Sequence, residues 1–194
     1  MQLKDYDERD GKRVWLTTDE VDLLLEQTKT TEQRIALGLG ARSGLRVSEI
    51  VDVTPTDVVN TSAGLRVRVW EGKGSKYRES PIPRDLHATI AAYGDVRDAG
   101  PDTPLVDKST RTVERWVQLA AERCQAETAD AGWQFLGPHD LRRTWGTLLV
   151  EAGVEPGMTM EWGGWEDWKT FREHYLGVYS PEMQRQEVAK VEWL

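Results

Sequence analysis

Most of the chain consists of apolar runs that follow helix-starting residues and are separated by short polar or glycine-containing stretches. TTDEVDLLLEQT opens with a capping box in which Thr17 is followed three residues later by Glu20. TEQRIALGLGARSG follows Thr30 and ends at Gly44, a residue suited to a helix stop. Further helices are predicted over VSEIVDV, RDLHATIAAYGDVRD, STRTVERWVQLAAERCQAE, PHDLRRTWGTLLVEAG and SPEMQRQEVAKVEWL.

A different period marks the middle of the chain. LRVRVW alternates strictly between apolar and charged residues, as a strand does. GKGSK then predicts a turn, and YRESPIP predicts a partner strand that ends at proline. Residues 1–12 are polar and are expected to be flexible. The predicted fold class is therefore α+β and mainly α-helical, with one small antiparallel β-sheet.

Composition narrows the class of protein further. A chain of 194 residues with 39% hydrophobic content can bury one core, and no apolar run is long enough to cross a bilayer. The first residues contain no apolar signal-peptide core, so a cytoplasmic protein without membrane partners is expected. Cys124 is the single cysteine and is expected to be a buried, inert thiol. The three histidines and this cysteine are widely spaced, so they predict no metal site.

The charge is acidic, with a formal net charge of −8 and a pI near 5.0, which argues against a nucleic-acid partner. Acidic residues are abundant and arginine outnumbers lysine, a bias also typical of proteins that work in concentrated salt. A salt-adapted source organism is therefore a hypothesis. The segment 64–84 differs, because it holds six basic residues and only two acidic ones. This local excess indicates either a solvated hairpin or an anion-binding surface.

Three short motifs could bind an anion. In PHDLRRTW, Pro138 starts a helix, so His139 and Arg142 lie three residues apart on one face near free amide donors, as an oxyanion site requires. In GLRVSE, Glu49 could orient Arg46 through a salt bridge. Lys73 lies at the tip of the predicted hairpin. Taken alone, each motif favours the ordinary interpretation, which is a capped helix, a surface ion pair and a solvated turn lysine respectively.

The order of these motifs is more informative than any one of them. G-L-R-V-S-E, then G-K-G-S-K-x-R-x-x-P-I, then P-H-D-L-R-R, then G-W and then a tyrosine resembles the tyrosine recombinase (phage integrase) family over nearly all of residues 13–179. The resemblance implies a catalytic domain over residues 13–180, in the tyrosine recombinase catalytic fold. It also implies a C-terminal helix over residues 181–194, which docks either on its own core or on a neighbouring copy. The N-terminal core-binding domain of the family is expected to be absent, and DNA binding in isolation is therefore expected to be weak.

The resemblance implies a catalytic set that grips the scissile phosphate, transfers protons and attacks: Arg46, Lys73, His139, Arg142, Trp165 and Tyr175. Glu49 would support the first arginine. Trp165 falls where many family members have histidine, and either side chain offers an N–H donor. The nucleophile usually comes nine residues after that position, whereas Tyr175 comes ten after it, and Tyr179 is the alternative. In WGGWEDWKTFREHYLGVY, Trp162 and Trp168 are then expected to be packing residues.

The expected activity is site-specific cutting and rejoining of double-stranded DNA through a 3′-phosphotyrosine intermediate, without metal, ATP or another cofactor. The arginines would stabilise the charge that develops on the phosphate, and clustered cations would ease deprotonation of the tyrosine. The expected partners are duplex DNA and further copies of the chain, as a tetramer on DNA, with a monomer in isolation as the alternative. The expected DNA contacts are Arg66, Arg68, Lys76, Arg78 and Arg143. A non-catalytic DNA-binding regulator and a type IB topoisomerase-like enzyme are the competing functions.

Overall fold

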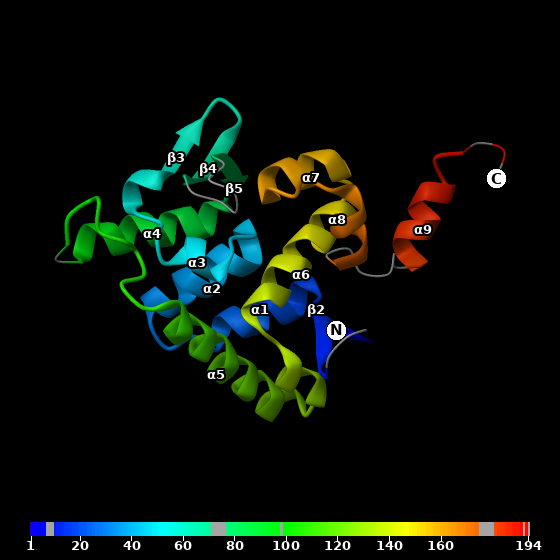
Figure 1. The fold of residues 1–194 in the computed structure, drawn as a ribbon, viewed down its shortest axis with the longest axis horizontal. Coiled ribbons are helices and arrows are strands. Elements are labelled where there is room, and N and C mark those ends of the chain that lie inside the picture. Colours follow the sequence, from blue (N-terminus) through cyan, green and yellow to red (C-terminus); the bar gives the residue numbers. More distant parts are fainter. Residues whose placement is uncertain (7–9, 71–76, 98, 175–180, 192, 194) are drawn as a thin grey trace.

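A computed structural model describes residues 1–6, 10–70, 77–97, 99–174, 181–191 and 193 (Figure 1). The helices in these ranges are α1 (Thr18–Glu26), α2 (Thr31–Ser43), α3 (Val47–Ile50), α4 (Arg84–Val96), α5 (Thr110–Thr128), α6 (Pro138–Glu151), α7 (Pro156–Gly163), α8 (Trp168–His174) and α9 (Pro181–Val188), with 3₁₀ turns η1 (Pro55–Asp57) and η2 (Ala131–Phe135). The strands are β1 (Gln2–Asp5), β2 (Lys12–Trp15), β3 (Val58–Thr61), β4 (Gly64–Val69) and β5 (Arg78–Pro81).

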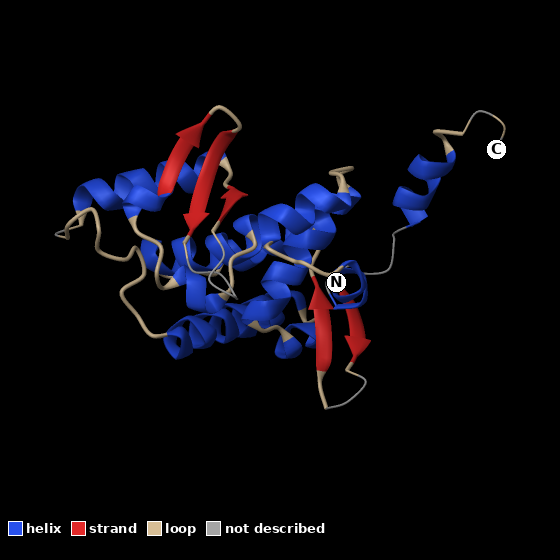
Figure 2. Cartoon of the chain, turned by 45° about the horizontal axis from the view of Figure 1, so that its top comes forward, coloured by secondary structure: helices blue, strands red, loops and turns tan. Residues whose placement is uncertain are grey.

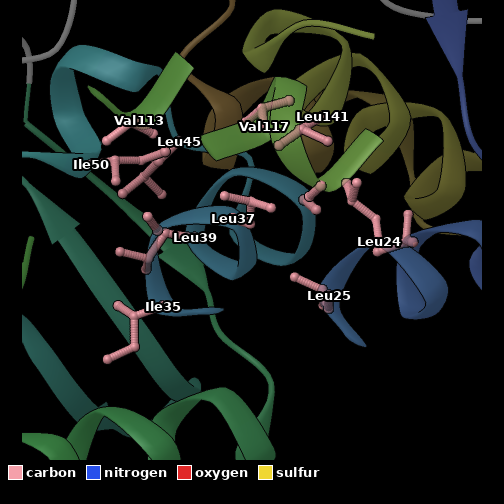
Figure 3. Close-up of a cluster of buried hydrophobic side chains, with 14 of the residues drawn as sticks. Leu24, Leu25, Ile35, Leu37, Leu39, Leu45, Ile50, Val113, Val117 and Leu141 are labelled. Carbon is pink, nitrogen blue, oxygen red and sulfur yellow. The ribbon is translucent and has the colours of Figure 1, made fainter. Parts of the chain in front are cut away.

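Helix α2 forms the centre of the fold. Its residues are buried on every side from Ile35 to Ala41, as expected of a helix that is surrounded by others. It packs against α1, α3, α4, α5 and α6. Figure 3 shows Leu37 of α2 in the same buried cluster as Leu24 of α1, Val117 of α5 and Leu141 of α6. The helices that carry GLRVSE and PHDLRRTW are thus fixed to one core.

The two sheets lie on different sides of the helices (Figure 2). One sheet is three-stranded and antiparallel, in the order β3-β4-β5, with Val67 opposite Ser80. The other pairs β1 with β2, and Leu3 lies opposite Val14. Strand β2 packs against α6. The Val14 N–H donates to Asp140 Oδ1 at 3.2 Å, and the Leu16 N–H donates to Thr144 Oγ1 at 3.0 Å.

The helix starts that the sequence signalled are confirmed, whereas the C-terminal helix α9 ends at Val188 and not at residue 194 as predicted. The Thr17 hydroxyl accepts from the Glu20 N–H, and the Glu20 carboxylate accepts from the Thr17 N–H, which completes the capping box. Thr30 caps α2, and Gly44 ends it in the left-handed conformation at φ 67°. Cys124 is fully buried, which confirms the expected burial, and burial raises the pKa of its thiol to about 12, so the thiol stays protonated at neutral pH.

The sheet content differs from the prediction in two places. The polar pattern of residues 1–12 predicted a flexible segment, but Gln2–Asp5 forms strand β1 and Lys12 begins β2. All four β1 residues are exposed, because backbone pairing rather than burial holds this strand, and hydrophobic periodicity does not report such pairing. Strand β3 was also not predicted, since four residues are too few to show a period.

Helix α9 stands apart from the other helices in both overall views (Figures 1 and 2). Two side chains at this end of the chain, Val188 and Trp193, are exposed. Within the described ranges, no helix combines the length and the apolar character that crossing a bilayer requires.

The sharp turn after α2 provides a stability test. At Gly44 a Cβ would lie 2.2 Å from Trp145 Cε3 in addition to adopting φ 67°, whereas at Gly153 the backbone is also left-handed at φ 87° but a Cβ would meet nothing within 4 Å. Gly153→Ala should therefore cost about 1 kcal/mol, from backbone strain alone. Gly44→Ala should cost about 2–4 kcal/mol, because overpacking against Trp145 adds to the strain. Chemical denaturation of both variants measures the difference, and equal losses would contradict it.

Candidate functional site

A cleft of about 570 Å³ lies between the three-stranded sheet, the start of α3 and the end of α7. Its lining includes Arg46, Ala63, Arg66, Tyr77, Arg78, Glu79, Met158, Glu161, Trp162, Gly164, Trp165 and Glu166. The cleft therefore unites residues of the GLRVSE motif, the hairpin and the aromatic stretch, which are far apart in the sequence. No group of His, Cys, Asp and Glu among the described residues could hold a metal ion.

The left-handed turn at Gly44 brings Arg46 to the first position before α3. Arg46 Nη1 donates to Glu49 Oε1 at 2.6 Å, and the Arg46 N–H donates to Glu49 Oε2 at 2.7 Å. The ion pair between these residues is thus present as the sequence predicted. It differs from an ordinary surface pair, because Glu49 is buried and Arg46 is only partly exposed.

A second arginine, from strand β5, grips the same carboxylate. Arg78 Nη1 donates to Glu49 Oε1 at 2.9 Å, and Arg78 Nη2 donates to Oε2 at 2.7 Å. Burial alone would raise the pKa of Glu49, but the hydrogen bonds and positive charges of Arg78, and then of Arg46, outweigh it. The pKa of Glu49 consequently falls from 4.5 to about 2, and its carboxylate is ionised at neutral pH.

Arg142 lies behind the cleft and is fully buried. Its guanidinium donates to the carbonyl oxygens of Gly44 and Gly163, so it joins the turn before α3 to the end of α7. The guanidinium also lies over the Trp165 ring, 4.1 Å from the ring centre. The two arginines that were predicted to bind one phosphate therefore meet at the same turn. Arg142 binds the carbonyl of Gly44 in that turn, and Arg46 follows Gly44 by two residues.

Trp165 is both a cleft residue and a core residue. Its ring packs 4.7 Å from that of Phe171 and 5.9 Å from that of Trp145, and its exposed fraction is 8%. Trp168, which was expected to pack, is 45% exposed, and its ring lies tilted against that of Phe171 with the ring centres 5.9 Å apart. Trp162 packs against the same buried cluster, as expected, but the indole of Trp165 also carries much of the packing.

His139 occupies the first turn of α6 and is exposed, in contrast to the buried Arg142 three residues later. Among the described residues, the lining of the cleft includes Arg46 and Trp165 but neither His139 nor Arg142. Helical spacing placed the two α6 side chains on one face, but the long Arg142 side chain turns inward to the two glycine carbonyls.

The predicted DNA contacts separate into exposed and buried groups. Arg66 and Arg68 are partly exposed: Arg66 lies over the Trp162 ring at 5.4 Å, and Arg68 Nε lies 3.5 Å from Glu79 Oε1. Lys73 and Lys76, together with Tyr175 and Tyr179, lie outside the described residues.

Arg78 and Arg143, the other described residues predicted to contact DNA, are buried, and their contact with DNA stays a prediction. Arg143 pairs with Asp140, and its Nη1 donates to the hydroxyl of Tyr6 at 3.3 Å, which ties α6 to the N-terminal hairpin. Sequence reasoning missed the inward position of Arg78. Alternation along β5 contained the signal, because Arg78, Ser80 and Ile82 share the buried face.

Comparison with known proteins identifies the family. The model of the phage integrase family matches residues 14–181, so the chain belongs to this family. A tyrosine recombinase of Thermosipho africanus (strain TCF52B) is 28% identical over 155 residues, which cover 76% of this chain and 51% of that protein. Tyrosine recombinase XerA of Thermococcus kodakarensis is 34% identical over 152 residues, covering 72% and 50% respectively. The chain spans about half the length of the curated relatives that it matches.

Solved structures agree on the fold. The crystal structure of XerA recombinase superposes with a TM-score of 0.73 at 21% identity, covering 91% of this chain and 64% of that one. XerH site-specific recombinase bound to palindromic difH substrate gives a TM-score of 0.70 at 18% identity, covering 92% and 52%. The helical architecture with small antiparallel sheets is therefore the tyrosine recombinase catalytic fold.

The ionised Glu49 carboxylate gives a pH-dependent contribution to stability. Because its pKa is lower in the folded chain than its ordinary value, the contribution is complete above about pH 5 and is lost as the pH falls toward 2. A shift from 4.5 to about 2 corresponds to about 3 kcal/mol. Between these pH values the wild type should lose about 3 kcal/mol more unfolding free energy than Glu49→Gln, measured by urea denaturation. Parallel pH profiles for the two proteins would contradict this assignment.

Proposed function

We propose that this chain is the catalytic domain of a site-specific DNA recombinase, which cuts and rejoins duplex DNA through a 3′-phosphotyrosine. The observation that carries the proposal is Arg46 at the cleft, held by the buried carboxylate of Glu49. Membership of the phage integrase family supports it. A guanidinium in a fixed orientation offers paired donors to a phosphate, and its value increases as charge develops during attack.

In this proposal Arg46 and Arg142 bind the scissile phosphate. Arg46 already reaches the cleft. Arg142 is covered, so its contact with the phosphate requires its guanidinium or the turn at Gly163 to move when DNA binds. The exchange is favourable for the guanidinium, because phosphate oxygens would replace two neutral carbonyl acceptors with charged ones.

The remaining roles follow the family pattern. Lys73 would protonate the departing 5′ oxygen, and His139 and Trp165 would donate to the phosphate. Tyr175 would attack the phosphorus while His139 assists transfer of its hydroxyl proton. The bond to the 5′ oxygen breaks, that oxygen takes a proton from Lys73, and the phosphotyrosine forms. The phosphotyrosine keeps the energy of the broken ester, so a 5′ hydroxyl can reverse the step without ATP, metal or another cofactor.

Duplex DNA is the proposed partner, and we place the protein with DNA in the cytoplasm. Two of the similar structures are of proteins whose names record a DNA complex, XerH with difH substrate and the Tn1549 transposon integrase with circular intermediate DNA. The partly exposed Arg66 and Arg68 lie on β4, beside the cleft, where they could hold the DNA backbone together with Lys76.

A covalent adduct tests the reaction directly. In a nicked duplex, cleavage releases a short fragment that carries the 5′ hydroxyl needed for rejoining, so the phosphotyrosine is trapped. A pool of duplexes with randomised sequences on both sides of the nick is used because the target site is unknown. The wild type should form an adduct that survives denaturing electrophoresis. Tyr175→Phe should abolish the adduct, whereas Tyr179→Phe should keep it. Loss with Tyr179→Phe alone would move the nucleophile, and no wild-type adduct on any duplex would favour a non-catalytic DNA-binding regulator.

Assembly on DNA is the second part of the proposal. We propose a homo-oligomer, a tetramer on DNA, in which α9 docks on a neighbouring copy, because α9 stands apart from its own core (Figures 1 and 2). A variant that ends at Ser180 should then stay folded and lose oligomers on DNA in light scattering. A lower melting temperature with unchanged oligomer size would instead indicate docking on its own core.

A further inference from the structure

We propose that Arg78 is a positioning residue of the active site, which sets the orientation of Arg46 through Glu49 and fixes the turn that carries Trp165. This inference rests on the proposed recombinase function. It concerns a residue that the sequence assigned to DNA contact, but whose guanidinium points into the protein. The side chain of Arg78 is 7% exposed.

Arg78 joins three parts of the cleft with one planar group. Its two terminal nitrogens bind the carboxylate of Glu49 on α3, at 2.9 and 2.7 Å. Its Nε donates to the carbonyl oxygen of Trp162 on α7 at 3.0 Å. The backbone of Arg78 itself belongs to β5, opposite Val69 of β4. One side chain thereby connects strand β5, helix α3 and the end of helix α7.

The fork shape of the guanidinium makes this connection directional. Glu49 Oε1 accepts hydrogen bonds from the guanidinium groups of Arg78 and Arg46. Glu49 Oε2 accepts one from the Arg78 guanidinium and one from the backbone N–H of Arg46. The paired bonds from Arg78 fix the plane of the carboxylate. The plane of the carboxylate decides where Nη1 of Arg46 can bind. The orientation of Arg78 therefore determines the orientation of Arg46 at the cleft.

The same side chain supports the turn after α7. Gly164 adopts φ 67°, and a Cβ there would lie 3.0 Å from Cδ of Arg78. The turn therefore rests directly on the aliphatic stem of Arg78, and the next residue is Trp165. Movement of Arg78 would displace Trp165 and Arg46 together.

A purely structural ion pair is the competing interpretation. Buried pairs often contribute little net stability, and apolar replacements can preserve the fold. If Arg78 only stabilised the fold, its removal would lower the folded fraction and the cleavage rate in parallel. A positioning role predicts a slower reaction per folded molecule, and it predicts that the loss depends on Glu49.

The test compares Arg78→Met, Arg78→Lys, Glu49→Gln and the double variant Arg78→Met/Glu49→Gln in single-turnover adduct formation on nicked duplex. Arg115→Met is the control, because it breaks an exposed Arg–Glu pair on α5. Each rate is divided by the folded fraction from circular dichroism. Arg78→Met should slow the reaction by about 100-fold, as expected for loss of one fixed donor to the phosphate. Arg78→Lys should recover only part of this, since it keeps the charge and loses the fork.

The double variant distinguishes the two interpretations. Because Arg78 also fixes the turn that carries Trp165, Arg78→Met should still slow the Glu49→Gln background, but by much less than it slows the wild type, since the part of the effect that passes through Glu49 is already lost. Arg78→Met should also acquire a decline in rate at acid pH, because the buried carboxylate then keeps only Arg46 and protonates more easily. Multiplicative losses in the double variant, or an unchanged rate per folded molecule in Arg78→Met, would overturn the proposal.

An activity-independent measurement separates this proposal from the proposed function. The Nε–H resonance of Arg46 in the NMR spectrum should be sharp and shifted in the wild type and averaged in Arg78→Met. If the wild type forms no adduct but this resonance responds, the recombinase function fails and the coupling of Arg78 to Arg46 stands. An unchanged Arg46 resonance in folded Arg78→Met overturns the coupling whatever the activity.

Discussion

The cleft depends on one buried carboxylate that accepts four hydrogen bonds from two arginines. Glu49 receives both terminal nitrogens of Arg78 and two donors of Arg46, so a single negative charge holds two positive ones. Removing an ion from water is costly, and only such dense pairing compensates for it. The arrangement holds the Arg46 side chain at the cleft through Glu49.

A second set of contacts closes the back of the site. Arg142 reaches the carbonyl oxygens of Gly44 and Gly163 and lies on the ring of Trp165. Both glycines lie against tryptophan rings, so closely that a Cβ would be 2.2 Å from Trp145 at one and 2.1 Å from Trp165 at the other. Close packing of backbone on indole thus fixes the carbonyls that hold the arginine, and small residues are required there for steric reasons.

The charges around the cleft are balanced rather than strongly basic. The described lining holds the arginines Arg46, Arg66 and Arg78 together with Glu79, Glu161 and Glu166, in a chain whose net charge is −8. A broad positive field would attract any polyanion. The cleft instead presents a few guanidiniums in fixed positions, with carboxylates beside them.

Residue patterns that act over a few positions predicted most of the helices and the hairpin of this protein. Capping residues such as Thr17 and Thr30, the stop at Gly44 and the alternation in LRVRVW predicted the helices and the hairpin, because these signals act within a few residues. Motif order predicted the family and the pairing of Arg46 with Glu49. Tertiary structure decided that Arg78 and Arg143 are buried, that Arg142 is covered and that residues 2–5 form a strand. The positions of the buried arginines depend on distant partners, such as Glu49, 29 residues from Arg78, and Tyr6, 137 residues from Arg143. No local pattern encodes which distant carboxylate, carbonyl or hydroxyl a long side chain will reach.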